Sequence, residues 1–221
     1  MKHRLFTLVE LLTVIAVIAI LAGIAVPVVV GMQSKGRETS ARADMNAIKI
    51  ALTQFKADYS VWPQVNPASG LTASGDLLIE TPYVPGSSLT DAETAYDNIT
   101  QCLTNNVVAS TTPTAPTGTA LYGNTKKRRY LDPPAKTVAT KNPLTGFYKL
   151  DPWGRRYNIA LDWNYNGKIE LTSSNKFGGE SSAVLGQILI YSYGTAEPKA
   201  SNPSETDDTE AFLCSWTTNA K

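Results

Sequence analysis

The stretch FTLVELLTVIAVIAILAGIAVPVVV, residues 6–30, contains one ionisable side chain, Glu10, and is otherwise almost wholly apolar. At about 25 residues it exceeds the roughly 20 that a helix needs to cross a bilayer. Lys2, His3 and Arg4 precede it, and such positive charge normally stays on the cytoplasmic side of a membrane. We therefore expect one membrane span with a cytoplasmic N-terminus and the rest of the chain outside the cytoplasm.

The helix is expected to continue well beyond this span. Pro27 removes a backbone donor and should bend it, but no strong break follows until residue 60. The continuation predicts one apolar stripe on a polar helix, because apolar side chains recur at steps of three and four at Met45, Ile48, Leu52, Phe55 and Tyr59. We expect this stripe to pack on the globular part of the same chain.

The rest of the chain predicts a small sheet domain. Residues 64–120 are rich in Ser, Thr, Pro and Gly, with one helical candidate at residues 91–106. The period then changes to two in stretches rich in Ile, Leu and Tyr, at 157–161, 168–171 and 187–193, which indicates antiparallel strands. A long helix packed on a small antiparallel sheet gives an α+β fold.

The composition argues against several classes of function. A formal net charge of +1 gives no reason to expect a nucleic-acid partner, which usually requires a strongly basic surface. The only histidine is His3, so Ser-His-Asp and Cys-His catalytic sites, and a His-ligated zinc site, lack an essential residue. We therefore expect a protein that is not an enzyme.

Glu10 is the residue of the span that requires an explanation. A carboxylate at the centre of an apolar helix costs roughly 2.5 to 3.5 kcal/mol and is expected to have a partner. A cut between Leu5 and Phe6 would create an amino terminus one helical turn from Glu10. That amine, on a neighbouring chain, is a natural counter-charge, so this helix is predicted to drive assembly.

The segment RLFTLVELLTVIAVIAILAGIAVP, residues 4–27, resembles the N-terminal cleavage and methylation motif of type IV prepilins and type II secretion pseudopilins. The resemblance implies cleavage by a prepilin peptidase after Leu5, N-methylation of Phe6 and extraction from the bacterial inner membrane. It also implies assembly, with an inner-membrane platform and minor pseudopilins, into a helical filament in the cell envelope. Glu10 matches the glutamate of the family and Pro27 its helix-bending proline. Leu5 departs from the glycine that usually precedes the cut.

A second stretch, DPWGRRYNI at residues 151–159, is similar to a segment of the major pseudopilin. We expect a structural role, in which Pro152 and Gly154 form a turn while Trp153 and Tyr157 bring apolar area to the sheet. These resemblances favour a subunit of a type II secretion pseudopilus. A type IV pilin on the cell surface and an anchored extracellular binding domain that never polymerises are the alternatives.

The predicted organisation follows from these segments. It has five parts: a leader peptide at 1–5, a membrane and filament-core helix at 6–30, an amphipathic continuation at 31–60, a loop-rich insertion at 61–140 and a sheet region with an acidic tail loop at 141–221.

Two stretches are candidates for binding calcium, the one cofactor considered. Asp162, Asn164 and Asn166 reproduce the opening of an EF-hand-type loop, in which alternate oxygen ligands face one ion. The alternative there is an Asn-Gly hairpin turn without metal. The second stretch, by resemblance to the calcium loop of the major pseudopilin, includes Glu197, Asp207 and Asp208, for which a solvated acidic loop is the alternative.

Two further features are left open by the sequence. Cys102 and Cys214 are the only cysteines and could pair in an oxidising compartment if their geometry permits it. Residues 126–129 are four adjacent positive charges, which predict a solvated loop or, alternatively, a contact with an acidic surface of a neighbouring subunit.

Overall fold

The computed structural model describes residues 8–64, 75–80, 91–105, 123–132, 149–171, 183–195 and 212–216, without the side chains of residues 24–31, 91, 93 and 94. The chain divides into two compact units, Met1–Thr39 and Ser40–Lys221. Helix α1 (Leu8–Tyr59) begins in the first unit and ends in the second.

The last five turns of α1 form the centre of the core of the second unit. Their buried side chains are spaced so that they share one helix face, and they are Ala41, Met45, Ile48, Ala51, Leu52 and Phe55. Tyr59 is partly buried against the same cluster. The predicted apolar stripe is therefore confirmed, and the helix ends at the predicted place, directly before Ser60.

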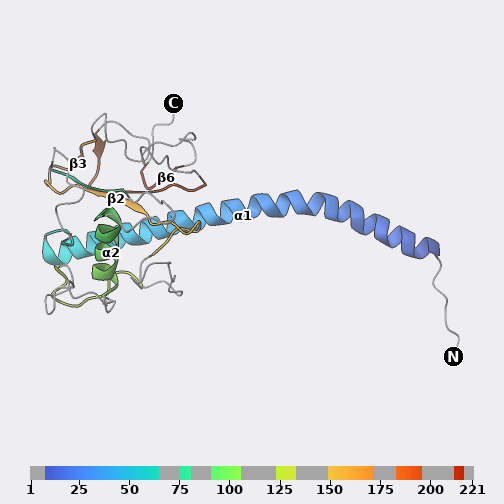
Figure 1. Ribbon diagram of the computed structural model, residues 1–221, viewed down its shortest axis with the longest axis horizontal. Coiled ribbons are helices and arrows are strands. Elements are labelled where there is room, and N and C mark those ends of the chain that lie inside the picture. The colour runs from blue at the N-terminus through green and yellow to red at the C-terminus, as the bar shows by residue number, and fades with distance from the viewer. Residues whose placement is uncertain are drawn as a thin grey trace. The chain divides into compact units, whose positions relative to one another are not determined.

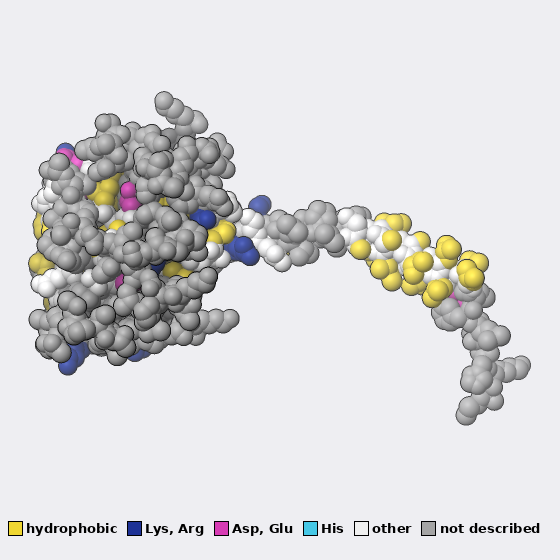
Figure 2. Space-filling model, viewed as in Figure 1, with side chains coloured by type: hydrophobic (Ala, Val, Ile, Leu, Met, Phe, Trp, Pro, Cys, Tyr) yellow, Lys and Arg dark blue, Asp and Glu magenta, His cyan; other side chains and the backbone are white. Residues whose placement is uncertain are grey.

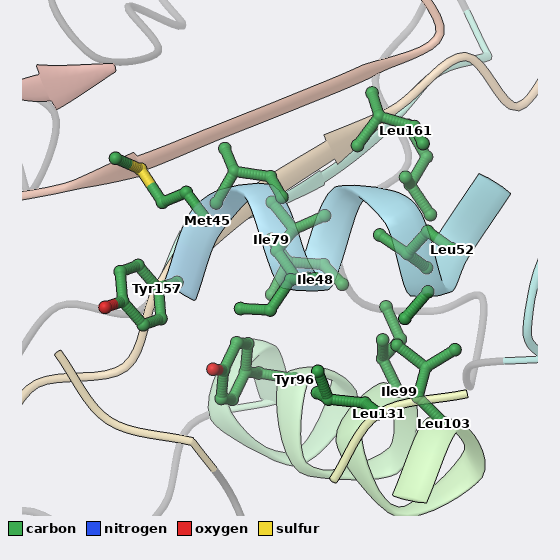
Figure 3. Packing of buried hydrophobic residues seen from close by; sticks show 14 of the residues in the cluster. Met45, Ile48, Leu52, Ile79, Tyr96, Ile99, Leu103, Leu131, Tyr157 and Leu161 are labelled. Atoms are coloured by element: carbon green, nitrogen blue, oxygen red, sulfur yellow. The ribbon is translucent and has the colours of Figure 1, made fainter. Parts of the chain in front are cut away.

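Helix α2 (Asp91–Thr104) confirms the helical candidate expected at residues 91–106. It buries Tyr96, Ile99 and Leu103 in the cluster that contains the stripe of α1. Figure 1 shows α2 crossing the last part of α1, and Figure 3 shows its side chains pointing toward Ile48 and Leu52.

A four-stranded antiparallel sheet lies over this part of α1. Its strand order is β1-β2-β5-β6, and its strands are β1 (Leu77–Ile79), β2 (Asn158–Leu161), β5 (Ile188–Ser192) and β6 (Leu213–Cys214). A separate two-stranded sheet pairs β3 (Lys168–Ile169) with β4 (Val184–Leu185). The predicted α+β arrangement, a helix packed on a small antiparallel sheet, is confirmed for the second unit.

The four-stranded sheet is apolar on both faces. Successive side chains of a strand point to opposite faces, so Ile79, Ile159 and Ile190 join the cluster around α1 and α2. Ala160, Leu189 and Tyr191 instead join a second cluster with Ile169 and Phe212. One sheet thus separates two hydrophobic clusters, and the described residues of α1 and α2 pack in the first of them.

The segment 151–157 forms a turn that is fixed by the buried carboxylate of Asp151. One carboxylate oxygen accepts hydrogen bonds from the backbone N–H groups of Trp153 (3.0 Å) and Arg155 (2.8 Å), and the other accepts one from the Ser192 hydroxyl (2.6 Å). Gly154 takes a φ of 85°, which favours glycine. The following Tyr157 is fully buried, so the segment has the structural role that the sequence predicts.

Ion pairs and hydrogen bonds connect this turn to both helices. Arg156 binds Asp97 of α2 through two hydrogen bonds, at 2.9 and 3.2 Å, and both side chains are nearly buried. On α1, the carboxylate of Asp44 pairs with Lys149 at 2.8 Å and accepts a hydrogen bond from the Tyr157 hydroxyl at 3.2 Å. These contacts fix the position of β2 relative to both helices.

Two isoleucines on α1 provide a matched test of this core. Ile48 is 0% exposed and Ile50 is 57% exposed. We expect Ile48→Ala to lower the free energy of unfolding by about 2 to 5 kcal/mol, because it leaves a cavity, and Ile50→Ala to change it by no more than about 0.5 kcal/mol. Chemical denaturation of the full chain in detergent measures both values. Equal losses in the two variants would contradict the packing described here.

Candidate functional site

The first unit presents an apolar helix surface. Every side chain of α1 from residue 8 to residue 23 is exposed, including that of Leu8 at 80% and that of Ile20 at 66%. Figure 2 shows hydrophobic side chains covering this stretch of the helix. Contiguous apolar patches of this kind mark interaction surfaces, and a helix that is apolar all round normally lies among other helices or in lipid.

Glu10 lies in the first turn of α1, within this apolar surface. Its side chain is exposed, and its backbone carbonyl accepts a hydrogen bond from the Thr13 hydroxyl at 2.9 Å. The N-terminal end of a helix favours a negative charge, so the fold tolerates a carboxylate at this position. The arrangement offers one anionic group on an otherwise apolar surface, which is suited to selecting one positively charged partner.

The other predicted residues of the N-terminal motif are not fully visible in the structure. Leu5 and Phe6 lie outside the described residues. Helix α1 continues without interruption through residue 27, although the side chain of Pro27 is not described. Over the described residues, no helix combines the length and the hydropathy needed to cross a membrane.

The loop that follows β2 uses the predicted calcium-loop residues to bind its own backbone. Asp162 is buried, and its two carboxylate oxygens accept hydrogen bonds from the N–H groups of Asn166 (3.0 Å) and Gly167 (2.9 Å). The side-chain oxygen of Asn164 accepts from Asn166 (3.0 Å), and that of Asn166 accepts from Lys168 (2.9 Å). Three alternate side chains of the loop therefore accept hydrogen bonds from its own N–H groups.

The alternative expectation for this loop, a hairpin turn at Asn166 and Gly167 joining two paired strands, is wrong. Strand β2 pairs with β1 and β5, whereas β3 pairs with β4 in the other sheet. The loop is a connection between two sheets, and its shape depends on the side chain of Asp162 rather than on a cross-strand ladder.

A second carboxylate, Asp76, lies beside this loop and was not found from the sequence. It directly precedes β1, whose pairing of Leu77 with Leu161 brings Asp76 opposite Asp162. Asp76 is buried, and one of its oxygens accepts a hydrogen bond from the N–H group of Glu170 at 2.8 Å. Burial, reinforced by the charge of Asp162, raises the pKa of Asp76.

Lys56 supplies positive charge near the same loop. Its ammonium lies 4.2 Å from the centre of the Trp62 ring and 4.7 Å from that of the Tyr165 ring, and it donates a hydrogen bond to Gln187 at 3.2 Å. Burial lowers the pKa of Lys56, while the charge of Asp162 acts in the opposite direction. A lysine between two aromatic faces therefore helps to balance the acidic loop.

In the part of the chain that the structure describes, no three His, Cys, Asp or Glu side chains gather as a metal-binding group. Glu197, Asp207 and Asp208 lie outside the described residues. Calcium binding at residues 162–166, and at the acidic tail, stays a prediction.

The two cysteines lie in different hydrophobic clusters. Cys102 of α2 is buried in the cluster around α1, where burial raises the pKa of its thiol to about 12. Cys214 of β6 packs against the cluster on the other face of the sheet. Their pairing as a disulfide stays a prediction.

Curated relatives connect this chain with secretion and pilus proteins. It is 36% identical over 84 residues to type II secretion system core protein G of Escherichia coli strain K12, a match that covers 38% of this chain and 54% of that protein. It is 32% identical over 72 residues to type IV major pilin protein PilE1 of Neisseria gonorrhoeae, covering 33% of this chain and 34% of that one. With fimbrial protein EcpC of Eikenella corrodens it shares 38% identity over 69 residues, or 31% of this chain and 45% of the relative.

These matches confirm the predicted resemblance to type IV pilins and type II secretion pseudopilins. The chain spans about half the length, or less, of these relatives. No family model matches the chain. No solved structure matches it either.

A calcium titration tests the loop at residues 162–166. With one carboxylate among its opening ligands, we expect binding on the order of 10⁻⁴ to 10⁻³ M, seen as a higher melting temperature in millimolar calcium than in chelator. Asp162→Asn should abolish this shift, and Asp132→Asn, at an exposed position, should retain it. A wild-type protein whose melting temperature does not respond to calcium would exclude the site.

The raised pKa of Asp76 predicts a pH dependence of stability. The fold binds the proton of Asp76 more tightly than the unfolded chain does, so this carboxyl stabilises the fold below its ordinary value of 3.8 and the contribution is lost as the pH rises through the raised pKa. Asp76→Asn should remove that loss, whereas Asp132→Asn should not. Denaturation curves between about pH 3 and pH 7 measure the slopes, and an unchanged slope in Asp76→Asn would refute the assignment.

Proposed function

We propose that this chain is a structural, non-catalytic subunit of a filament of the type II secretion pseudopilus class, and that it polymerises through its N-terminal helix. The observation that carries the proposal is the exposed apolar surface of residues 8–23, with Glu10 as its one charge. The similarity to type II secretion system core protein G supports the same class.

Before assembly, residues 6–30 hold the chain in the bacterial inner membrane, with the N-terminus in the cytoplasm and the second unit outside it. A prepilin peptidase removes residues 1–5 by cutting after Leu5, and the new terminus at Phe6 is N-methylated. The long apolar run supports this stage, because its side chains can lie in lipid until they pack against other subunits.

During assembly, the carboxylate of Glu10 pairs with the N-terminal amine of a neighbouring subunit. In an apolar surrounding, the two charges stabilise each other only when they are in contact. A misplaced subunit would leave each charge buried without a counter-charge, which is unfavourable. The pair therefore selects the axial position of each new subunit, while the apolar side chains around it supply contact area. An inner-membrane platform and minor pseudopilins are the expected partners, and Pro27 is expected to bend the helix within the packed core.

The second unit is suited to being displayed by such a filament. It has its own buried core, and α1 contributes the central stripe of that core. Because the same helix carries the apolar surface at its other end, the contact that builds the filament and the domain that is displayed belong to one continuous element.

Two alternative functions can be compared with this proposal on specific observations. The similarity to type IV pilins supports a subunit of a surface pilus, whereas the turn at residues 151–157 resembles the major pseudopilin and favours the secretion system. An anchored extracellular domain that never polymerises would share the apolar helix but would have no use for Glu10.

Two glutamates of α1 give a matched test of polymerisation. We expect Glu10→Ala to insert into the membrane normally and to lower the yield of polymer by about tenfold or more, because it removes the charge pair between subunits. Glu38→Ala, at a partly exposed position of the same unit, should polymerise as the wild type does. Sedimentation of sheared filaments measures the yield, and full polymerisation of Glu10→Ala would refute the proposed role.

A further inference from the structure

Four consecutive basic residues, Lys126, Lys127, Arg128 and Arg129, form an exposed surface of the second unit, here called the tetrabasic loop. All four are exposed, and the loop lies beside the last turn of α1, since Arg128 contacts Asp58. A run of like charges normally repels itself and stays solvated. In the tetrabasic loop the side chains are exposed, but the backbone is held in one conformation by hydrogen bonds.

The backbone of the tetrabasic loop is held in place by a buried asparagine. The amide nitrogen of Asn124 donates to the carbonyl oxygens of Cys102 (2.8 Å) and Arg128 (2.7 Å), and its oxygen accepts from the Arg128 N–H group (3.1 Å) and the Tyr59 hydroxyl (2.9 Å). One fully buried side chain thus ties the loop to both helices.

Further contacts fix the basic side of the loop itself. The N–H group of Lys126 donates to the Tyr59 hydroxyl at 2.7 Å, and its ammonium lies over the Tyr59 ring at 5.1 Å. Lys127 takes a φ of 51°, in the left-handed region that a residue with a β-carbon rarely adopts. Backbone strain of this kind persists only where the surroundings impose it, so the four charges are presented in a defined arrangement.

The loop keeps a surplus of positive charge after its internal contacts are made. Asp58 pairs with Arg128 at 2.9 Å, and its backbone carbonyl accepts from the Lys126 ammonium at 2.9 Å. Within the described ranges, no ion pair involves Lys127 or Arg129. Arg128 and Arg129 line an open hollow of about 420 Å³, together with Gln54, Ala57, Asp58 and Tyr130.

The chain itself carries a segment of the complementary charge. Residues 205–210 contain Glu205, Asp207, Asp208 and Glu210, four carboxylates in six positions. This segment lies outside the described residues, and only its charge enters the argument. The whole chain has a net charge of +1, so its positive and negative charges are nearly balanced in number but concentrated in different segments. In a polymer of identical subunits, every copy offers both.

We propose that the tetrabasic loop of one copy binds the acidic segment 205–210 of a second copy and so forms a contact between displayed domains in the filament. This inference rests on the proposed function, because it requires that copies polymerise. A contact that joins two different surfaces repeats along a helical assembly. Opposed charges on those surfaces favour the correct arrangement and repel incorrect ones.

A charge-reversal cycle in the full chain tests the contact. K127E/R129E changes the two basic residues that do not bind Asp58, and D207K/D208K changes the acidic partner. We expect each pair of substitutions to lower polymer yield by about tenfold and the combination of all four to restore it to within about threefold. Unchanged membrane insertion and melting temperature show that folding is intact. Wild-type yield from K127E/R129E, or no restoration in the combined variant, would overturn the inference.

Cross-linking gives a readout that does not depend on yield. Membranes containing a mixture of ¹⁴N- and ¹⁵N-labelled wild-type chain are treated with a carbodiimide, which joins an amine directly to a carboxylate. We expect Lys126 or Lys127 joined to the segment 205–210 in peptides that combine one light and one heavy chain. The absence of such mixed pairs, or the presence of same-copy pairs alone, would contradict the inference. A wild-type chain that forms no polymer would contradict the proposed function, whereas polymer without mixed pairs contradicts only this contact.

Discussion

Burial of one face of α1 between the sheet and α2 is the interaction on which the second unit depends. The stripe that runs from Ala41 to Phe55 is fully or almost fully buried, and apolar side chains of β1, β2, β5 and α2 pack against it (Figure 3). At roughly 1.5 to 3 kcal/mol for each large buried side chain, this contact is the main source of stability.

Polar contacts around the stripe determine where the other elements attach to α1. Asp44 binds Lys149 and Tyr157 on one side, and Asp58 binds Arg128 and Tyr130 near the end of the helix. The Tyr130 hydroxyl lowers the pKa of Asp58, and Arg128 adds to that effect. The same helix therefore orients the turn at residues 151–157 and the tetrabasic loop, although both segments lie far from α1 in the sequence.

Local patterns were sufficient to predict the parts of the fold that depend on neighbouring residues. In the stripe of α1, in helix α2 and in the strands around residues 159 and 190, apolar side chains recur at a regular spacing over several residues. This periodicity can be recognised in the sequence. Strand β1 has only three residues and forms because it pairs with β2, about 80 positions later. The position of Asp76 and the hydrogen bonds of Asn124 to both helices likewise depend on contacts between residues that are distant in the sequence. The hairpin expected at Asn166 and Gly167 failed for this reason too, since long-range pairing rather than the turn residues selected the partner strands.

The chemical state of the mature N-terminus shows whether the N-terminal helix serves assembly as well as attachment. Mass spectrometry of the N-terminal peptide from protein purified out of its native membranes reads that state. We expect a chain that begins at N-methylated Phe6, which places an amine one helical turn from Glu10. A chain that begins at any residue other than Phe6, including one that retains residues 1–5, would contradict this role of the helix.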